Sequence, residues 1–151
     1  MAVTSGSHPF GLWVVTVGWQ GDTVYRVHFG RTGPDGPVHP LIRRYLMGQE
    51  VDFGGISTPA GEEDGVTPAI YRAVRRVGYG EVATYGDIAK QVGTSPRAVG
   101  QAMARNPTPL IVPCHRIVSA HGIGGFTPPI EIKRDLLAME ERVSRVRKGR
   151  V

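Results

Sequence analysis

Cys114 is the only cysteine among 151 residues, and its neighbours could change its chemistry. Pro113 precedes it and His115 and Arg116 follow it, inside an apolar run over residues 111–118. The thiolate is the nucleophilic form of cysteine, and nearby cations lower the pKa of a thiol. We therefore interpret Cys114 as a candidate nucleophile activated by His115 and Arg116. The alternative is a buried structural cysteine that behaves as a small apolar side chain.

The composition is that of a globular protein, with 40% hydrophobic and 21% charged residues. No stretch approaches the roughly 20 apolar residues of a membrane span, and residues 1–10 lack the pattern of a signal peptide. We therefore expect an intracellular protein, cytoplasmic or nuclear, without membrane attachment. One cysteine excludes an intramolecular disulfide, and no Cys or His cluster has metal-ligand spacing, so we predict no metal site.

The net charge of +5 is unevenly distributed along the chain. Residues 1–65 carry four arginines and seven acidic residues, whereas residues 66–151 carry fourteen basic and six acidic residues. A strongly basic domain attracts polyphosphates through counterion release, so nucleic acid is the leading candidate partner. A solvated surface with an arginine-rich tail is the alternative, and charge alone does not separate the two.

The first part of the chain predicts strands followed by a short helix. Residues 12–17 and 23–29 are rich in β-branched and aromatic side chains and predict a hairpin around Gly18–Asp22. One or two short strands are expected before it. Residues 39–47 have the spacing of a helix that stops at Gly48, with an apolar face formed by Leu41, Ile42, Tyr45 and Leu46. The Gly-rich segment 54–65 divides the chain into an N-terminal α/β subdomain, residues 1–60, and a C-terminal domain, residues 66–151.

The C-terminal domain predicts short capped helices. The first begins at Thr67-Pro68 and ends near Gly78. Residues 84–87 resemble a capping box that opens a second helix, which Gly93 closes. Residues 94–96 supply an N-cap and a first-turn proline for a third helix that runs to about residue 106. The last two helices form a helix-turn-helix.

The third helix carries small side chains at Ala98, Gly100, Ala102 and Ala104, with Arg97 and Arg105 as long basic exceptions. A helix that reads major-groove edges needs long polar side chains, so a bare surface favours close contact that is indifferent to sequence. The alternative, which the spacing leaves equally open, is that the small residues pack against a neighbouring helix.

These segments together resemble the O6-alkylguanine-DNA alkyltransferase family. The resemblance rests on residues 79–85 (YGEVATY), 95–103 (SPRAVGQAM), Asn106-Pro107 and 111–118 (IVPCHRIV), in the family's order and spacing. It implies DNA repair by direct reversal, in which the alkyl group of O6-alkylguanine is transferred irreversibly to Cys114 after base flipping. It also implies a winged helix-turn-helix and a ribonuclease-H-like N-terminal subdomain, an α+β fold overall.

Site residues follow from the resemblance position by position. It implies a relay from Cys114 through a water to His115 and then Glu140; without it, Glu140 would pass for a salt-bridged surface residue. Arg97 would fill the gap left by the flipped base, and Tyr85 would promote its rotation. The predicted catalytic residues are Cys114, His115, Glu140, Tyr85 and Asn106; the predicted DNA contacts are Arg97, Tyr85, Ala98, Ala102, Arg105 and Arg116; and the predicted substrate pocket is Met103, Pro109, Val118, Phe126 and Thr127.

A thioether has no good leaving group, so each molecule is expected to act once, as a monomer, without a cofactor, on double-stranded DNA carrying O6-alkylguanine. Phe126 and Thr127 stand where the family more often has tyrosine and serine, which leaves the range of accepted adducts open. Two alternatives remain. One is a DNA binder without chemistry, either a winged-helix protein or a lesion-binding alkyltransferase-like protein. The other is a cysteine hydrolase that uses Cys114 and His115.

Overall fold

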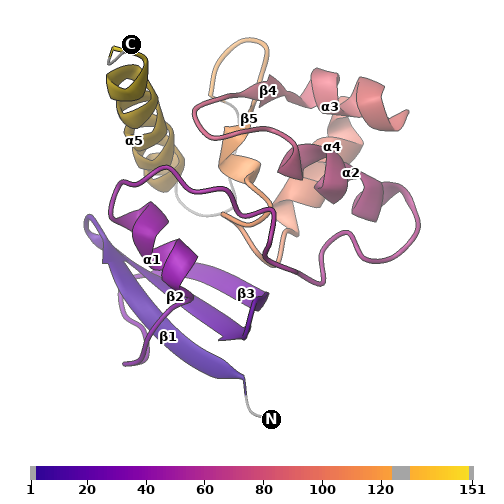
Figure 1. The fold of residues 1–151 in the computed structure, drawn as a ribbon. Helices are drawn as coiled ribbons and strands as arrows, with labels where there is room; N and C mark the ends of the chain where they lie inside the picture. Colours follow the sequence, from indigo (N-terminus) through magenta and orange to yellow (C-terminus); the bar gives the residue numbers. More distant parts are fainter. Residues whose placement is uncertain (1–2, 124–129, 150–151) are drawn as a thin grey trace.

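The structure, a computed structural model, describes residues 3–123 and 130–149. The fold is α+β, with a small antiparallel sheet, a group of three short helices, and a long C-terminal helix. In Figure 1 the sheet and α1 occupy one end, helices α2, α3 and α4 occupy the other, and α5 stands beside α1. The segment that carries Cys114 runs between these parts.

Three strands form the sheet in the order β1-β2-β3: β1 (Thr4–Phe10), β2 (Trp13–Gln20) and β3 (Thr23–Gly30). The predicted hairpin is confirmed as β2 and β3, but its turn was placed too early. Gly18 lies at a bulge in β2, which continues to Gln20, and the turn is Gly21–Asp22. Gly21 has φ = 57°, a conformation that glycine adopts without steric cost. A single strand, β1, precedes the hairpin.

Helix α1 (Pro40–Leu46) confirms the helix expected over residues 39–47. The Nδ1 atom of His39 accepts a hydrogen bond from the Leu41 amide, and Pro40 occupies the first helical position, so the start of the helix is well capped. Ile42, Tyr45 and Leu46 turn inward and are buried. The sequence assigned Tyr45 to this apolar face without giving its hydroxyl a role.

The core beneath the sheet draws on both parts of the chain. Val15, Val17 and Ile42 are fully buried there. They share one cluster with residues from the segment before Cys114 and from α5 (Ile130–Lys148), which are Leu110, Ile111, Ile132, Leu136 and Met139. Helix α5 therefore packs on the N-terminal layer, and a side chain on α1 can meet one on α5.

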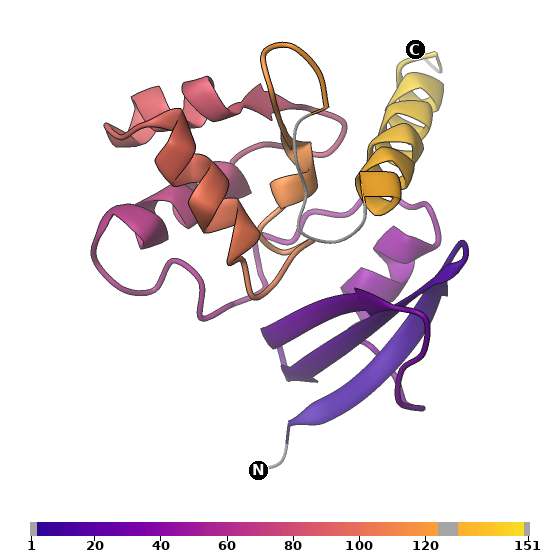
Figure 2. The same cartoon turned by 180° about the vertical axis from the view of Figure 1, so that it is seen from behind.

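Helices α2 (Val66–Arg75), α3 (Tyr85–Val92) and α4 (Pro96–Ala104) enclose a second core. Figure 2 shows these helices from behind. The predicted capping box is confirmed, because Thr84 and Asp87 each accept the other's backbone N–H. Gly93 closes α3 with φ = 84°, and Ser95 caps α4. The two helices predicted as a helix-turn-helix are therefore present.

Helix ends differ from the predictions by a few residues. Helix α2 begins at Val66 instead of Thr67, with Gly65 as N-cap and no side-chain cap, and it ends at Arg75. Helix α4 ends at Ala104. Strands β4 (Ala83–Thr84) and β5 (Ile117–Val118) pair in parallel. No helix within residues 3–123 and 130–149 is both long and apolar enough to span a membrane.

Candidate active site

Cys114 begins a 3-10 turn, η1 (Cys114–Arg116), and is buried, with 4% of its surface exposed. Its amide donates to the Val112 carbonyl at 2.7 Å, and Asn106 Nδ2 donates to the same oxygen at 2.9 Å. The side-chain oxygen of Asn106 also accepts from the Thr108 amide at 3.1 Å. Asn106 therefore ties the chain after α4 to the turn that carries the thiol.

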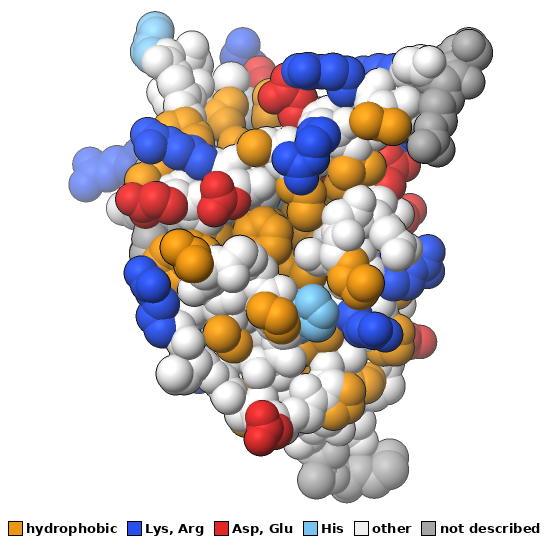
Figure 3. Space-filling view, turned by 90° about the vertical axis from the view of Figure 1, so that its left-hand side faces the viewer, with side chains coloured by type: hydrophobic (Ala, Val, Ile, Leu, Met, Phe, Trp, Pro, Cys, Tyr) orange, Lys and Arg blue, Asp and Glu red, His pale blue; other side chains and the backbone are white. Residues whose placement is uncertain are grey.

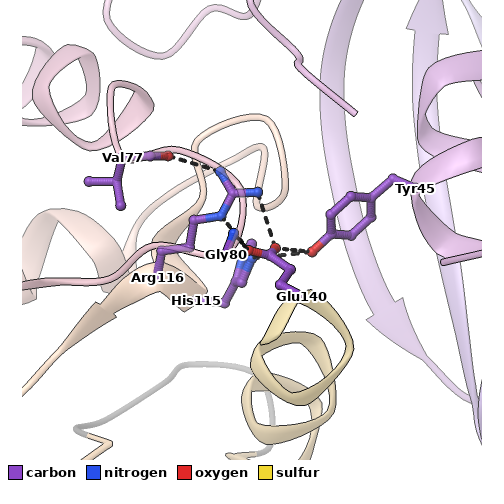
Figure 4. Close-up of polar contacts among 6 residues, drawn as sticks. All are labelled: Tyr45, Val77, Gly80, His115, Arg116 and Glu140. Carbon is purple, nitrogen blue, oxygen red and sulfur yellow. Dashed lines mark hydrogen bonds and ion pairs between the residues drawn. The ribbon is translucent and has the colours of Figure 1, made fainter. Parts of the chain in front are cut away.

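Glu140, on α5, is buried, contrary to the surface position that its sequence pattern alone would give it. Figure 4 shows the side chains that surround its carboxylate. Oε2 accepts hydrogen bonds from His115 Nε2 at 2.6 Å, from the Tyr45 hydroxyl at 2.5 Å and from Arg116 Nη2 at 3.1 Å. Oε1 accepts from Arg116 Nε at 2.8 Å and from the Gly80 amide at 3.0 Å. Three donating side chains thus meet at one buried carboxylate.

This hydrogen bonding fixes the charge states of the relay. Burial alone would raise the pKa of Glu140, but hydrogen bonds from His115 and Arg116, together with the charge of Arg116, hold it well below its usual range. Burial lowers the pKa of His115, so its ring is neutral at neutral pH and the permanent counter-charge of Glu140 is Arg116. Because Nε2 donates to Glu140, Nδ1 of the neutral ring is left as a proton acceptor.

The resting thiol is not activated in the way the sequence predicted. Burial raises the pKa of Cys114 to about 11, against the opposing effects of an Asn106 hydrogen bond and the charge of Lys133. The expected lowering by His115 and Arg116 is wrong for the resting protein. His115 is neutral, and Arg116 is paired with Glu140. The thiol is therefore protonated at neutral pH and needs a base.

Lys133 is a second buried cation near the thiol, on α5. Its side chain is fully buried, and Nζ donates to the Ile117 carbonyl at 2.6 Å and lies 5.9 Å from the centre of the Tyr85 ring. Burial lowers its pKa to about 8, while the influence of Cys114 opposes this shift. A protonated Lys133 thus favours the thiolate, although sequence reasoning did not single it out.

Cys114 borders a cleft of about 700 Å³. The predicted pocket residues Met103 and Pro109 lie on its wall together with Asn106. Strand β3 of the N-terminal part also lines this cleft, over residues 25–29. Val118 is half-buried, pairs with Thr84, and is not among the described residues that line this cleft. Phe126 and Thr127 lie outside the described residues.

The four DNA contacts predicted on α4 and at its C-cap differ in exposure. Arg97 and Arg105 are exposed. Ala102 is fully buried in the core between α2, α3 and α4, and Ala98 is half-buried against the same core. The DNA contact predicted for Ala102 is wrong, because the alternative reading, packing against neighbouring helices, applies to it.

Arg97 and Tyr85 lie together at the surface. They line a shallow hollow of about 470 Å³ between the starts of α3 and α4, where Ser119 and Ala120 form another wall. None of the described residues that line this hollow also lines the cleft beside Cys114. Arg97 therefore lies near Tyr85, which is predicted to act on the same nucleotide.

The DNA contact predicted for Arg116 is also wrong. Its side chain is buried, with two guanidinium nitrogens donating to Glu140 and Nη1 donating to the Val77 carbonyl at 2.9 Å (Figure 4). Every donor nitrogen thus has a partner inside the protein. Arg116 holds the carboxylate in place and cannot reach a phosphate.

Sequence reasoning missed two residues of this site. Tyr45 looked like an ordinary apolar-face residue of α1, and only its hydroxyl distinguishes it from phenylalanine. Lys133 left a detectable signal, because it precedes Leu136 by three residues and so lies on the apolar face of α5, where a lysine is unusual. Within residues 3–123 and 130–149, no three His, Cys, Asp or Glu side chains gather as metal ligands would.

Comparison with known proteins decides the family. Residues 66–142 match the family model of the 6-O-methylguanine DNA methyltransferase DNA-binding domain. The chain belongs to this family. A relative from Metallosphaera sedula, a methylated-DNA–protein-cysteine methyltransferase, is 44% identical over 105 residues, which cover 70% of this chain and 67% of the relative. The segment that matches the family model includes Cys114, His115, Arg116 and Glu140.

Solved structures extend the similarity to the N-terminal part. The O6-methylguanine-DNA methyltransferase of Pyrococcus kodakaraensis strain KOD1 aligns with a TM-score of 0.70 and 28% identity, covering 91% of this chain and 98% of that one. The Mycobacterium tuberculosis OGT in complex with DNA aligns with a TM-score of 0.73 and 25% identity, covering 95% and 94%. The sheet and α1 therefore belong to the shared fold of the family members.

Proposed function

We propose that this protein repairs DNA by direct reversal, taking the alkyl group from O6-alkylguanine onto Cys114 in a single, irreversible transfer. The observation that carries the proposal is the position of Cys114, the only thiol, in the wall of a cleft of about 700 Å³. Ligand pockets commonly have volumes of about 300–1,000 Å³, so a flipped nucleobase fits this range. The names of the relatives, which describe methyl transfer from DNA to a protein cysteine, support the same reaction.

The proton relay described above supplies the chemistry. His115, neutral and oriented by Glu140, removes the proton of the Cys114 thiol through an intervening water. The sulfur then attacks the alkyl carbon, the carbon–O6 bond breaks, and its electron pair stays on the guanine, which takes up a proton. The product is an unmodified guanine and a thioether. No second nucleophile is available to cleave the thioether, so one molecule repairs one base.

DNA would approach the helix-turn-helix side, where Arg97, Arg105 and Tyr85 are available at or near the surface. Arg97 would enter the stack in place of the flipped base, and Tyr85 would act on the adjoining phosphate. The small residues Ala98 and Gly100 let the α4 backbone come close. Figure 3 shows a different face, the left-hand side of Figure 1, on which Lys and Arg side chains are scattered among acidic and apolar ones.

The finer features of the fold belong to the same proposal. The sheet with α1 is consistent with a ribonuclease-H-like N-terminal subdomain over residues 1–60, and α3 and α4 with the β4–β5 pair are consistent with a winged helix-turn-helix within residues 66–151. We propose a monomer that binds duplex DNA carrying O6-alkylguanine inside the cell, at the nucleoid or in the nucleus. Neither a cofactor nor a metal enters the proposed reaction.

Mass spectrometry tests the transfer directly. The protein is incubated with a duplex containing one O6-methylguanine, and peptides are analysed for methylation. We expect one methyl group per protein molecule, on the peptide that contains Cys114, and restored guanine in the DNA. Cys114→Ala should bind the duplex and leave the lesion unchanged. Methyl loss from DNA with Cys114→Ala would refute the mechanism, and tight binding without transfer by the wild-type protein would favour the lesion-binding alternative.

A further inference from the structure

We propose that Tyr45 is a positioning residue for alkyl transfer, through which the N-terminal sheet-and-helix layer completes the relay of Glu140 and His115. The inference rests on the proposed function and extends it to a residue outside the matched segment 66–142. Tyr45 is fully buried, and its hydroxyl lies 2.5 Å from Glu140 Oε2 and 3.2 Å from His115 Nε2. Both described partners of this hydroxyl are members of the relay.

Helix α1 holds Tyr45 firmly in this position. The capped start of α1 fixes the helix, and the neighbouring residues Ile42 and Leu46 are anchored in the core beneath the sheet. The Tyr45 ring packs against Phe53, with ring centres 5.5 Å apart, and against Tyr79 at 5.9 Å in an edge-to-face arrangement. The hydroxyl therefore has one orientation open to it, toward α5 (Figure 4).

The hydroxyl acts as a permanent donor to Glu140. Burial, followed by the charge of Glu140, raises the pKa of Tyr45 well above its usual value, so the phenol stays protonated. Its hydrogen bond competes with His115 for the charge on Oε2 and restrains the oxygen in place. The other charged groups around the His115 ring are Arg116 on η1 and Lys133 on α5, and both oppose its protonation. Tyr45 thus helps to keep His115 neutral and able to accept a proton.

Tyr79 provides a matched control. It is another tyrosine beside the relay, with a hydroxyl that is buried and has no hydrogen-bond partner among the described residues. Tyr45→Phe and Tyr79→Phe remove the same atom from two rings whose centres lie 5.9 Å apart. Both variants keep the aromatic ring and lose a buried hydroxyl, but only Tyr45→Phe removes a hydrogen bond to the relay, so an effect on the relay is expected of Tyr45→Phe alone.

The test measures single-turnover methyl transfer from an O6-methylguanine duplex together with the titration of the His115 ring by NMR in the full-length protein. We expect Tyr45→Phe to slow transfer about tenfold at neutral pH, a fraction of the 10²- to 10⁴-fold that a general base contributes. The His115 titration should move to higher pH, because Glu140 then attracts its proton more strongly. Tyr79→Phe should leave both quantities at wild-type values. Duplex affinity should be unchanged in either variant.

A second variant covers the case in which Tyr45→Phe folds poorly. Site-specific 3,5-difluorotyrosine at position 45 keeps the ring and hydroxyl but donates more strongly, so the His115 titration should move to lower pH. An unchanged His115 titration in both Tyr45 variants, or wild-type transfer by a folded Tyr45→Phe, would overturn the assignment of Tyr45. Absence of transfer by the wild-type protein would instead overturn the proposed function, and the two failures are distinguishable because the titration requires no DNA.

Discussion

Glu140→Gln should destabilise the protein strongly, although it replaces only one oxygen by an amide group. The carboxylate is 1% exposed and accepts five hydrogen bonds, two of them from the buried guanidinium of Arg116. Glutamine leaves this guanidinium without a counter-charge and places an NH₂ group among donors. Removing one partner of a buried ion pair costs about 3–5 kcal/mol. That loss is a large fraction of the roughly 5–15 kcal/mol that stabilises a typical domain.

Urea and thermal unfolding followed by circular dichroism would measure this loss. For a chain of this size about 1 kcal/mol corresponds to 2–4 °C, so the melting temperature should fall by roughly 6–20 °C. Glu141→Gln is the matched control, because Glu141 is the next residue on α5 and its ion pair with Arg145 is exposed. Surface substitutions of this kind usually change stability by less than about 0.5 kcal/mol.

The pH dependence of the difference adds a second criterion. The pKa of Glu140 lies well below its ordinary value of 4.5 in the folded protein. The unfolded chain therefore takes up the proton first as pH falls, so the stabilisation is complete above pH 4.5 and is lost below it. The gap between the wild-type protein and Glu140→Gln should be constant from pH 7 to about 5 and shrink at lower pH. A loss under about 1 kcal/mol, or a gap that ignores pH, would refute the proposed charge network.

Three further outcomes are expected. Without DNA, carboxamidomethylation of Cys114 by iodoacetamide should accelerate about tenfold per pH unit from pH 7 to 9, because its pKa is raised to about 11; a rate that levels off near pH 7 would contradict the raised pKa. Arg97→Ala should slow transfer from a methylated duplex about tenfold or more but spare transfer from free O6-benzylguanine, which needs no flipping; equal losses on both substrates would count against its place in the stack. Thr84→Ala should lower the free energy of unfolding by about 1 kcal/mol in urea titrations, since it removes the capping box of α3; unchanged stability would show that the cap contributes nothing.

The parts of the fold that could be predicted from sequence are those that local hydrogen bonds determine. Thr84 with Asp87, and Ser95 before Pro96, satisfy backbone groups within three residues, so their pattern shows directly in the sequence. The bulge at Gly18 was mistaken for a turn, because glycine serves both purposes and only the pairing with β3 distinguishes them. Local spacing likewise could not decide whether Ala102 faces DNA or the core.

The relay shows the limit of prediction from sequence more clearly. Cys114 and His115 were identified from their local sequence and Glu140 through the family's pattern, whereas Tyr45 lies 95 residues from Glu140 in the chain. No local periodicity reports a contact over that distance. The position of Arg116 was misjudged for the same reason, because its partners Glu140 and Val77 come from other segments. From the sequence alone Arg116 suggested a DNA contact, because its counter-charge, Glu140, comes from a distant segment.

The raised pKa of Cys114 is physically suited to a nucleophile that can be used only once. An exposed thiolate would react with any soluble electrophile, and each such reaction would destroy a molecule of protein. Burial keeps the sulfur protonated, while the neutral His115 ring, which Glu140 orients, is available as the proton acceptor. Only a small fraction of the thiol is ionised, and reaction of this thiolate with an electrophilic carbon in the cleft draws the proton transfer forward. The low fraction of thiolate in the resting protein therefore slows the reaction of Cys114 with small electrophiles.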